Sequence, residues 1–486
     1  MSASTTKSIL WSFMEQAGSR FIAMIVEIVL ARLLAPEMFG VMAILLVLIN
    51  VADVVAQSGL GVALIQRQDT TPLSYTTAFW VSEGIALFLY ALVFFGAPLF
   101  AWFYQMDKLT LLTRVLALVL FFKAFNSIQR SFLQKEMRFR ALFISNTLAV
   151  TVAGLIGISL AFLGLGVWAL IAQYLAQGIF ACLTMFIQVP WKPTMNFSLA
   201  EAKRLFGYGW KICISGIFGK LYTGLSDLVI GKACNAAELG YYSNGSKWPT
   251  AGMAAFSNAL ENVLFPVFSS ISSDLEALKR AVKKALLVGT YLMVFVSFLL
   301  IITAEPLIQL LLTEKWLPSV PVFQLTCLTF SFCMLQIVNL RAYMALGDSG
   351  LYMKLQIVKV VFGMCVITLV AVLTADIYWV AATNTAVSVA NILIIDLHPA
   401  KKRIGIGRWE QIKLVSPCFF LGLTAAVIAY PISYIDLSDM LMFLIQFGVF
   451  SLVYLGASRV LKMKAHTELI IALKEMRRKR EDNSEN

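Results

Sequence analysis

Two stretches of this chain, 200 residues apart, decide its fold: RFIAMIVEIVLARLLAPEMFGVM (residues 20–42) and KLYTGLSDLVIGKACNAAELGYY (residues 220–242). Four sparse polar or glycine positions match without a gap: Arg20 with Lys220, Glu27 with Asp227, Arg32 with Lys232 and Gly40 with Gly240. Agreement between apolar positions carries no weight in such hydrophobic segments, whereas agreement of rare positions indicates an internal duplication. We therefore predict two related bundles of helices.

The composition around these stretches is that of an integral membrane protein. Of 486 residues, 59% are hydrophobic and 14% are charged, and the mean hydropathy is +0.81. Soluble proteins carry roughly 25% charged residues, and disordered or nucleic-acid-binding chains carry fewer apolar ones. Water-soluble domains and a nucleic-acid partner are excluded, and an enzyme with a separate catalytic head is not expected.

The apolar runs predict an all-α polytopic membrane protein with about fourteen transmembrane helices, at about 20 residues a span. The expected spans lie near residues 8–34, 39–64, 77–103, 110–133, 141–163, 166–189, 205–233, 238–268, 284–313, 318–346, 351–374, 376–397, 410–431 and 439–461. A polar connection at residues 190–204 separates the sixth and seventh spans, and Ser198 followed by Glu201 predicts a helix start there.

These spans predict two parallel six-helix bundles plus two C-terminal helices. The predicted parts are an N-terminal bundle (1–190), a cytoplasmic connection (191–204), a C-terminal bundle (205–400), two additional helices (401–461) and a basic cytoplasmic tail (462–486). An even number of spans in each copy gives both bundles the same orientation, and we expect a central cleft between them that opens to each side in turn.

Lys and Arg are distributed unevenly between alternate loops. One set of loops holds Arg67, Lys135, Arg138, Arg140, Lys192, Lys203, Arg204, Lys279, Arg280, Lys283, Lys284, Lys401, Lys402, Arg403, Arg408 and the tail residues Arg477 to Arg480. The opposite set offers little beyond Lys108 and Lys315. Since cytoplasmic loops carry the excess of cations, both termini are predicted to be cytoplasmic, and the tail is expected near anionic lipid.

Charged and amide residues recur at helical spacing inside the predicted spans. Arg20 and Glu27 are seven residues apart, as are Lys220 and Asp227; Asp53 continues a stripe with Asn50 and Gln57, and Lys123 continues one with Asn126 and Arg130. A charge at a helix centre costs roughly 2.5 to 3.5 kcal/mol on the insertion scale. Such stripes are therefore expected to face water or partners, although the charges could instead only hold helices together.

The sequence offers no catalytic, metal or cofactor site. The chain has two histidines, His398 and His466, and seven cysteines without Cys-x-x-C spacing, so zinc and haem lack evident ligands. No glycine-rich loop carries the Lys and Ser or Thr that cradle a phosphate. We expect neither a bound cofactor nor ATP hydrolysis by this chain.

Three segments resemble a known family: LARLLAPEMFGVMAI (30–44), SGLGVALIQRQD (58–69) and APLFAWFY (97–104). They are similar to the N-terminal half of polysaccharide-biosynthesis flippases in the multidrug/oligosaccharidyl-lipid/polysaccharide exporter superfamily. The resemblance is strongest to Wzx-type lipid-linked oligosaccharide flippases, in particular the colanic-acid-exporter-like branch. It covers most of the chain and is weak after residue 400.

The resemblance implies a substrate and a site. The substrate would be an undecaprenyl-diphosphate-linked oligosaccharide, moved from the cytoplasmic to the periplasmic leaflet of a bacterial inner membrane for exopolysaccharide or O-antigen assembly, with a polysaccharide polymerase complex as a candidate partner. A cleft with basic side chains would meet the diphosphate and sugars. On that basis Arg20, Lys220, Lys123 and Arg130 are expected near the head group, with Glu27, Asp53 and Asp227 balancing charge or coupling transport.

Three alternatives remain open at this point. A cation-coupled multidrug exporter would share the fold but would favour an acidic, apolar cleft. A lipid II flippase would handle the same diphosphate, and the sequence discriminates poorly against it. A structural component of a polymerising complex would explain the helices but not the paired charges.

Overall fold

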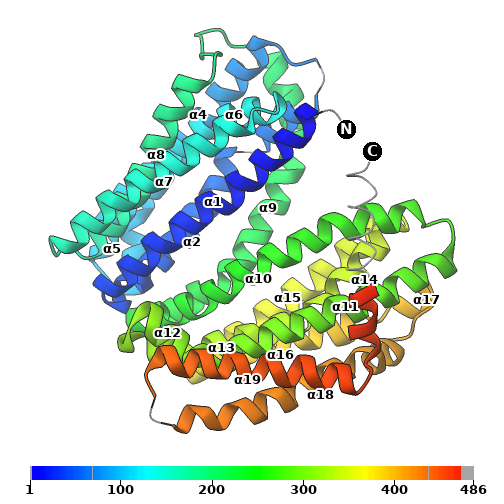
Figure 1. Ribbon diagram of the computed structural model, residues 1–486. Coiled ribbons are helices and arrows are strands. Elements are labelled where there is room, and N and C mark those ends of the chain that lie inside the picture. The colour runs from blue at the N-terminus through cyan, green and yellow to red at the C-terminus, as the bar shows by residue number, and fades with distance from the viewer. Residues whose placement is uncertain (1–2, 58, 68, 436, 472–486) are drawn as a thin grey trace. The chain divides into compact units, whose positions relative to one another are not determined.

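The computed structural model describes residues 3–57, 59–67, 69–435 and 437–471, and the regular secondary structure of this part of the chain is entirely helical, without a strand. The chain divides into two compact units, Met1–Gly240 (unit 1) and Tyr241–Asn486 (unit 2). The helices of each unit can be followed in Figure 1. The prediction of an all-α polytopic protein is confirmed at this level.

Unit 1 consists of nine helices and the first turn of a tenth, as far as the structure describes it. They are α1 (Ala3–Leu33), α2 (Pro36–Gln57), α3 (Leu60–Gln66), α4 (Pro72–Tyr104), α5 (Lys108–Leu116), α6 (Val119–Lys135), α7 (Phe139–Phe162), α8 (Val167–Gln188), α9 (Leu199–Ala233) and the start of α10 (Ala236–Ser270). Helix α7 packs between α1 and α8, while α2 packs on α4, α6 and α9.

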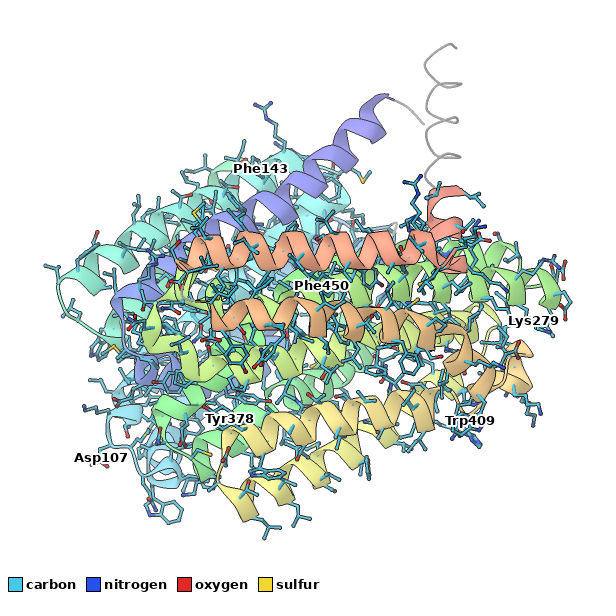
Figure 2. All side chains as sticks on the ribbon, turned by 60° about the horizontal axis from the view of Figure 1, so that its bottom comes forward. Asp107, Phe143, Lys279, Tyr378, Trp409 and Phe450 are labelled. Carbon is cyan, nitrogen blue, oxygen red and sulfur yellow. The ribbon has the colours of Figure 1, made fainter. Side chains whose placement is uncertain are left out.

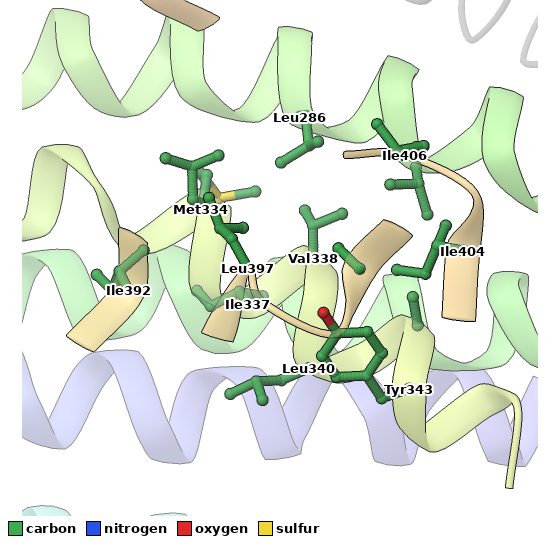
Figure 3. Close-up of a cluster of buried hydrophobic side chains, with 14 of the residues drawn as sticks. Leu286, Met334, Ile337, Val338, Leu340, Tyr343, Ile392, Leu397, Ile404 and Ile406 are labelled. Carbon is green, nitrogen blue, oxygen red and sulfur yellow. The ribbon is translucent and has the colours of Figure 1, made fainter. Parts of the chain in front are cut away.

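Unit 2 contains the rest of α10 and the helices that follow. They are α11 (Leu275–Ile302), α12 (Ala304–Leu312), η1 (Glu314–Ser319), α13 (Val320–Ser331), α14 (Cys333–Ala345), α15 (Ser349–Thr374), α16 (Ile377–Ala390), η2 (Asn391–Asp396), α17 (Ala400–Ile404), α18 (Arg408–Ala429), η3 (Tyr430–Tyr434) and α19 (Asp439–Val460). Helix α11 packs on α13, α14 and α18. Figure 3 shows the core that results, with Leu286, Met334 and Val338 among its buried side chains.

Eleven helices in the described part of the chain are long and apolar enough to cross a membrane. The remaining long helices, α1, α9 and α10, are not among the eleven. Two of them carry predicted charged pairs: Arg20 and Glu27 lie on α1, and Lys220 and Asp227 lie on α9. Because only eleven helices qualify, the count of fourteen spans stays a prediction.

Several predicted spans are interrupted. The span expected near 39–64 breaks after α2, where Gly59 has a left-handed backbone (φ 65°) that favours glycine. The spans near 318–346 and 376–397 divide into η1, α13 and α14, and into α16 and the π-helical η2. Short turns of altered pitch leave no mark on hydropathy, so the sequence could not reveal these breaks.

Helix ends repeat at the spacing of the duplication. Helix α1 ends at Leu33 and α9 at Ala233, and α2 begins at Pro36 and α10 at Ala236. The first turn of α10 also packs directly on α2. A Cβ atom added to Gly40 would lie 1.8 Å from the Ala236 carbonyl oxygen, and one added to Gly240 would lie 2.0 Å from the Pro36 carbonyl oxygen. Only glycine allows the two backbones to approach this closely.

Helix α9 belongs to unit 1, although the sequence analysis placed it at the start of the second bundle. It begins after Ser198, whose side chain accepts a hydrogen bond from the Glu201 backbone nitrogen (3.3 Å), as predicted. It then packs on α2, α3 and α4. The predicted division into two six-helix bundles stays a prediction.

Basic residues gather at one end of unit 2. Figure 2 shows Lys279 and Trp409 at that end and Tyr378 toward the other. Ion pairs join neighbouring segments there, including Lys283 with Glu410 (2.6 Å) and Arg403 with Asp348 (2.7 Å). These segments are loops that the Lys and Arg content assigned to one side of the membrane. In this unit they lie together.

Candidate functional site

Unit 1 contains a partly open cavity of about 800 Å³ with polar and charged side chains in its wall. Helices α2, α3, α6, α7, α8 and α9 all contribute to its wall. Polar and charged side chains make up half of the lining: Asp53, Gln57, Lys123, Asn126, Ser127, Arg130, Ser131, Gln134, Asn146, Tyr174 and Gln177. A polar hollow inside helices of this apolarity marks a place where water or a hydrophilic ligand can lie at membrane depth.

An ion pair lies in the wall of this cavity. The Lys123 ammonium lies 3.1 Å from Oδ2 of Asp53, and the Gln57 amide donates to Oδ1 of the same carboxylate at 2.9 Å. Both charged side chains are largely withdrawn from solvent, with 28% and 16% of their surface exposed. Asp53 therefore neutralises Lys123, which leaves the three charged lining residues with a net charge of +1.

Helical periodicity explains how α6 and α8 supply the lining. The α6 residues lie at positions 123, 126, 127, 130, 131 and 134, and the α8 residues at 174, 177, 178, 181 and 185. These spacings of three and four place each set along one helix face. Gly61 lets α3 close the cavity against α6, because a Cβ atom there would lie 2.4 Å from the Ser131 hydroxyl oxygen.

Sequence reasoning missed the part of the wall that α7 and α8 contribute. Asn146, Tyr174 and Gln177 line the cavity together with the predicted α6 stripe. The amide donor of Asn126 reaches the Gly178 carbonyl oxygen (3.4 Å), whereas its amide oxygen has no hydrogen-bond partner among the described residues. The recurrence of polar residues at helical spacing in the span near 166–189 was the signal that could have revealed this face.

The predicted site residues fall into separate groups. Lys123, Arg130 and Asp53 line the cavity, and Arg20 and Lys220 do not. Arg20 on α1 and Lys220 on α9 have exposed side chains, while Glu27 and Asp227 on the same helices are half-buried. Contact of Arg20 and Lys220 with a substrate therefore stays a prediction.

Unit 2 contains a second polar cluster, which is centred on Asp396. This residue was not among those predicted from the sequence. The Lys359 ammonium lies 3.0 Å from Oδ1 and 3.1 Å from Oδ2 of this fully buried carboxylate. The Gln336 amide also donates to Oδ2 (3.2 Å), and the Tyr343 hydroxyl donates to the Asp396 backbone carbonyl (2.8 Å). The π-helical turn η2 ends at Asp396 and places it among these partners.

Two further polar pairs lie near this cluster. Asn339 and Gln411 exchange amide hydrogen bonds of 2.8 and 3.1 Å in the buried core. Arg341 forms an ion pair with Glu261. Within the described ranges, no group of three or more His, Cys, Asp or Glu residues could hold a metal ion.

A clamp of charged residues joins the start of α4 to the start of α9 at one end of unit 1. Arg67 binds Glu201 and Asp69, each at 2.9 Å, and Ser74 donates to Glu201 at 3.0 Å. The hydrogen bond from Arg67 lowers the pKa of Asp69 to about 2. Partial burial alone would raise the pKa of Glu201, but the bonds from Arg67 and Ser74 outweigh burial and the pKa is lowered.

Proteins of polysaccharide synthesis are similar to this chain in sequence. The succinoglycan biosynthesis transport protein ExoT of Rhizobium meliloti is 25% identical over 324 residues, which cover 67% of this chain and 66% of that protein. The teichuronic acid biosynthesis protein TuaB of Bacillus subtilis is 26% identical, covering 71% of each chain. The lipopolysaccharide biosynthesis protein WzxC of Escherichia coli is 27% identical, covering 62% of this chain and 61% of that protein. The match thus spans less than two thirds of ExoT and of WzxC.

Transporters of known structure share the fold. The inward closed conformation of the lipid II flippase MurJ matches with a TM-score of 0.75 and 16% identity, covering 93% of this chain and 98% of that one. An inward-facing multidrug resistance transporter of the MATE family matches with a TM-score of 0.59 and 12% identity, covering 82% and 95%. At these identities the likeness concerns the fold alone.

The sequence match to a family extends over most of the helices that build the cavity. It runs from residue 29 to residue 321, which is more than half of the chain, and includes all of α2 to α12. On this match the chain belongs to the polysaccharide biosynthesis protein family.

Proposed function

We propose that this protein moves an undecaprenyl-diphosphate-linked oligosaccharide from the cytoplasmic to the periplasmic leaflet of a bacterial inner membrane, for assembly of a surface polysaccharide. The observation that carries the proposal is the polar cavity of about 800 Å³ inside helices of a family that takes part in polysaccharide synthesis. In this proposal both termini are cytoplasmic. The cleft expected between the two bundles opens to each side of the membrane in turn.

The proposed cargo sets the physical problem that such a cavity would solve. A hydrophilic head group must pass about 30 Å of hydrocarbon, where each unsatisfied polar group costs several kcal/mol. Side-chain amides, hydroxyls and cations in the wall would replace the lost water, while the prenyl chain stays in lipid. We propose that Lys123, Arg130, Arg20 and Lys220 meet the head group and that Asp53, Glu27 and Asp227 balance their charge.

A deletion strain tests this function directly. Loss of the gene should abolish the surface polymer and lead to accumulation of undecaprenyl-linked repeat units, because the cargo would remain at the inner face. A strain that lacks the gene yet makes normal amounts of polymer would contradict the proposal. Accumulation of lipid II would instead indicate a peptidoglycan substrate, and increased drug sensitivity with normal polymer would indicate a drug exporter.

Complementation then tests the site. The variant Lys123→Met, Asp53→Asn removes both members of the ion pair, so that no charge is left without its partner. We expect normal insertion, measured by immunoblot of the membrane fraction, with polymer reduced at least ~10-fold, the equivalent of about 1.4 kcal/mol. The matched control Lys108→Ala removes an exposed cation outside the cavity and should leave polymer unchanged. Full polymer from the double variant would remove this pair from the site.

A further inference from the structure

The cavity of unit 1 has the charge balance of a sugar site rather than of a diphosphate site. We infer that it binds pyranose rings of the transported repeat unit, and that the diphosphate binds elsewhere on the protein. This inference rests on the proposed function and assigns one part of the head group to one set of residues.

The charge of the cavity lining is poorly suited to a diphosphate. Asp53 holds Lys123 at 3.1 Å and accepts a second hydrogen bond from Gln57, so the one carboxylate among the described lining residues is already paired with the lysine. A diphosphate would need several uncompensated cations and would be repelled by Asp53 in the same wall. With Arg130 the described lining residues carry a net charge of +1, which suits a neutral ring or one that carries a single carboxylate.

The hydrogen-bonding groups of the cavity lining are well suited to sugar hydroxyls. Five amide side chains line the cavity: Gln57, Asn126, Gln134, Asn146 and Gln177. An amide offers two donors and an acceptor, which suits sugar hydroxyls because each hydroxyl both donates and accepts. The amide oxygen of Asn126, without a partner among the described residues, is one acceptor that a sugar hydroxyl could satisfy. Tyr174 adds a ring with an apolar body and a polar tip.

Discrimination against other ligands follows from the same amides. An apolar drug in this cavity would leave the amide oxygen of Asn126 buried without a partner, at about 1–3 kcal/mol. A site built to hydrogen-bond hydroxyls rejects analogues that lack them. The volume lies within the ~300–1,000 Å³ that is usual for small-molecule sites, so more than a single ring can be accommodated.

Two native cysteines make the inference testable on the intact protein. Cys213 lines the cavity, whereas Cys234 is half-buried at the end of α9 and lies outside the lining. Purified protein in nanodiscs would be modified with methyl methanethiosulfonate, and peptide-resolved mass spectrometry would give a rate for each thiol. The probes are methyl glycosides of hexoses, N-acetylhexosamines and hexuronic acids, with sodium pyrophosphate and farnesyl diphosphate as head-group probes without sugar. If Cys213 reacts too slowly to time, the variant Gln177→Cys supplies a thiol in the same lining.

We expect at least one class of glycoside to slow the modification of Cys213 by ~5-fold or more, with Cys234 unaffected and neither diphosphate probe protective. The variant Gln177→Leu should weaken this protection by about 5- to 100-fold in concentration, the range for one lost buried hydrogen bond. The matched control Gln66→Leu, an exposed glutamine on α3 outside the lining, should protect normally. Absence of protection by every glycoside, or equal protection by pyrophosphate, would overturn the inference.

Failure of the inference and failure of the proposed function give different results. If the deletion strain loses its polymer while pyrophosphate protects Cys213 as well as any glycoside does, the transport function stands and the sugar assignment is wrong. If a glycoside protects Cys213 but the deletion strain makes normal polymer, the cavity binds sugar and the proposed transport function is wrong.

Discussion

Replacing Gly40 by alanine should break the closest helix contact of unit 1. The added Cβ atom would lie 1.8 Å from the Ala236 carbonyl oxygen, 2.8 Å from the Ala236 carbonyl carbon and 2.9 Å from the Gly240 nitrogen. All three neighbours are backbone atoms, so no side chain can rotate away to make room. Helix α2 and the first turn of α10 would have to separate.

The size of the effect follows from these distances. Real Cβ atoms essentially never approach another heavy atom within 3.0 Å, so the carbonyl must retreat by about 1.2 Å from its position at 1.8 Å. Forcing extra atoms into a packed contact costs about 1–3 kcal/mol when side chains can adjust, and a rigid backbone places this case at the upper end. At ~2–4 °C per kcal/mol for a unit of this size, the melting temperature should fall by about 5–10 °C.

The assay is thermal unfolding in detergent, followed by fluorescence-detected size exclusion. Gly84→Ala and Gly96→Ala on α4 are the matched controls, because a Cβ atom at either position meets nothing within 4 Å. These two variants should leave the melting temperature unchanged or raise it slightly, since alanine favours a helix by ~1 kcal/mol over glycine.

The duplicated glycine sharpens the test. Gly240→Ala meets the Pro36 carbonyl oxygen at 2.0 Å and should cost a similar amount. The double variant should cost clearly less than the sum, because one separation of the helices makes room for both methyl groups. Strict additivity, or a Gly40→Ala melting temperature equal to that of Gly84→Ala, would show that this contact does not exist in the protein.

Two further predictions concern buried and clamped charges. Asp396→Asn leaves Lys359 buried without its counter-ion and should destabilise unit 2 by about 3–5 kcal/mol. Adding Lys359→Met should restore most of the melting temperature in the same thermal assay. Equal losses of melting temperature in the single and the double variant would argue against the ion pair. The lowered pKa of Glu201 means that its bond to Arg67 stabilises the clamp above about pH 4 and is lost as the pH falls through the lowered pKa. Hydrogen exchange in residues 199–206, corrected for intrinsic rates, should therefore increase between pH 5 and 2 in the wild type but not in Glu201→Gln, which lacks the titrating group.

Local patterns in the sequence were sufficient for the class of the protein and for much of its candidate site. Hydropathy over spans of about 20 residues indicated a helical membrane protein, and the 200-residue spacing anticipated the matching ends of α1 and α9. The α6 stripe with Lys123 and Arg130 also lines the cavity. These features are readable because each depends on composition or on the period of a single helix.

Tertiary structure alone decided which polar faces meet. Lys123 pairs with Asp53 from 70 residues away, and Lys359 pairs with Asp396 at the end of a π-helical turn that no hydropathy pattern marks. Helix α9 packs on α2, α3 and α4 within unit 1, which its own hydropathy does not reveal. Periodicity tells which side of a helix is polar, but the partner of that side depends on how helices cross and on which small residues let their backbones approach.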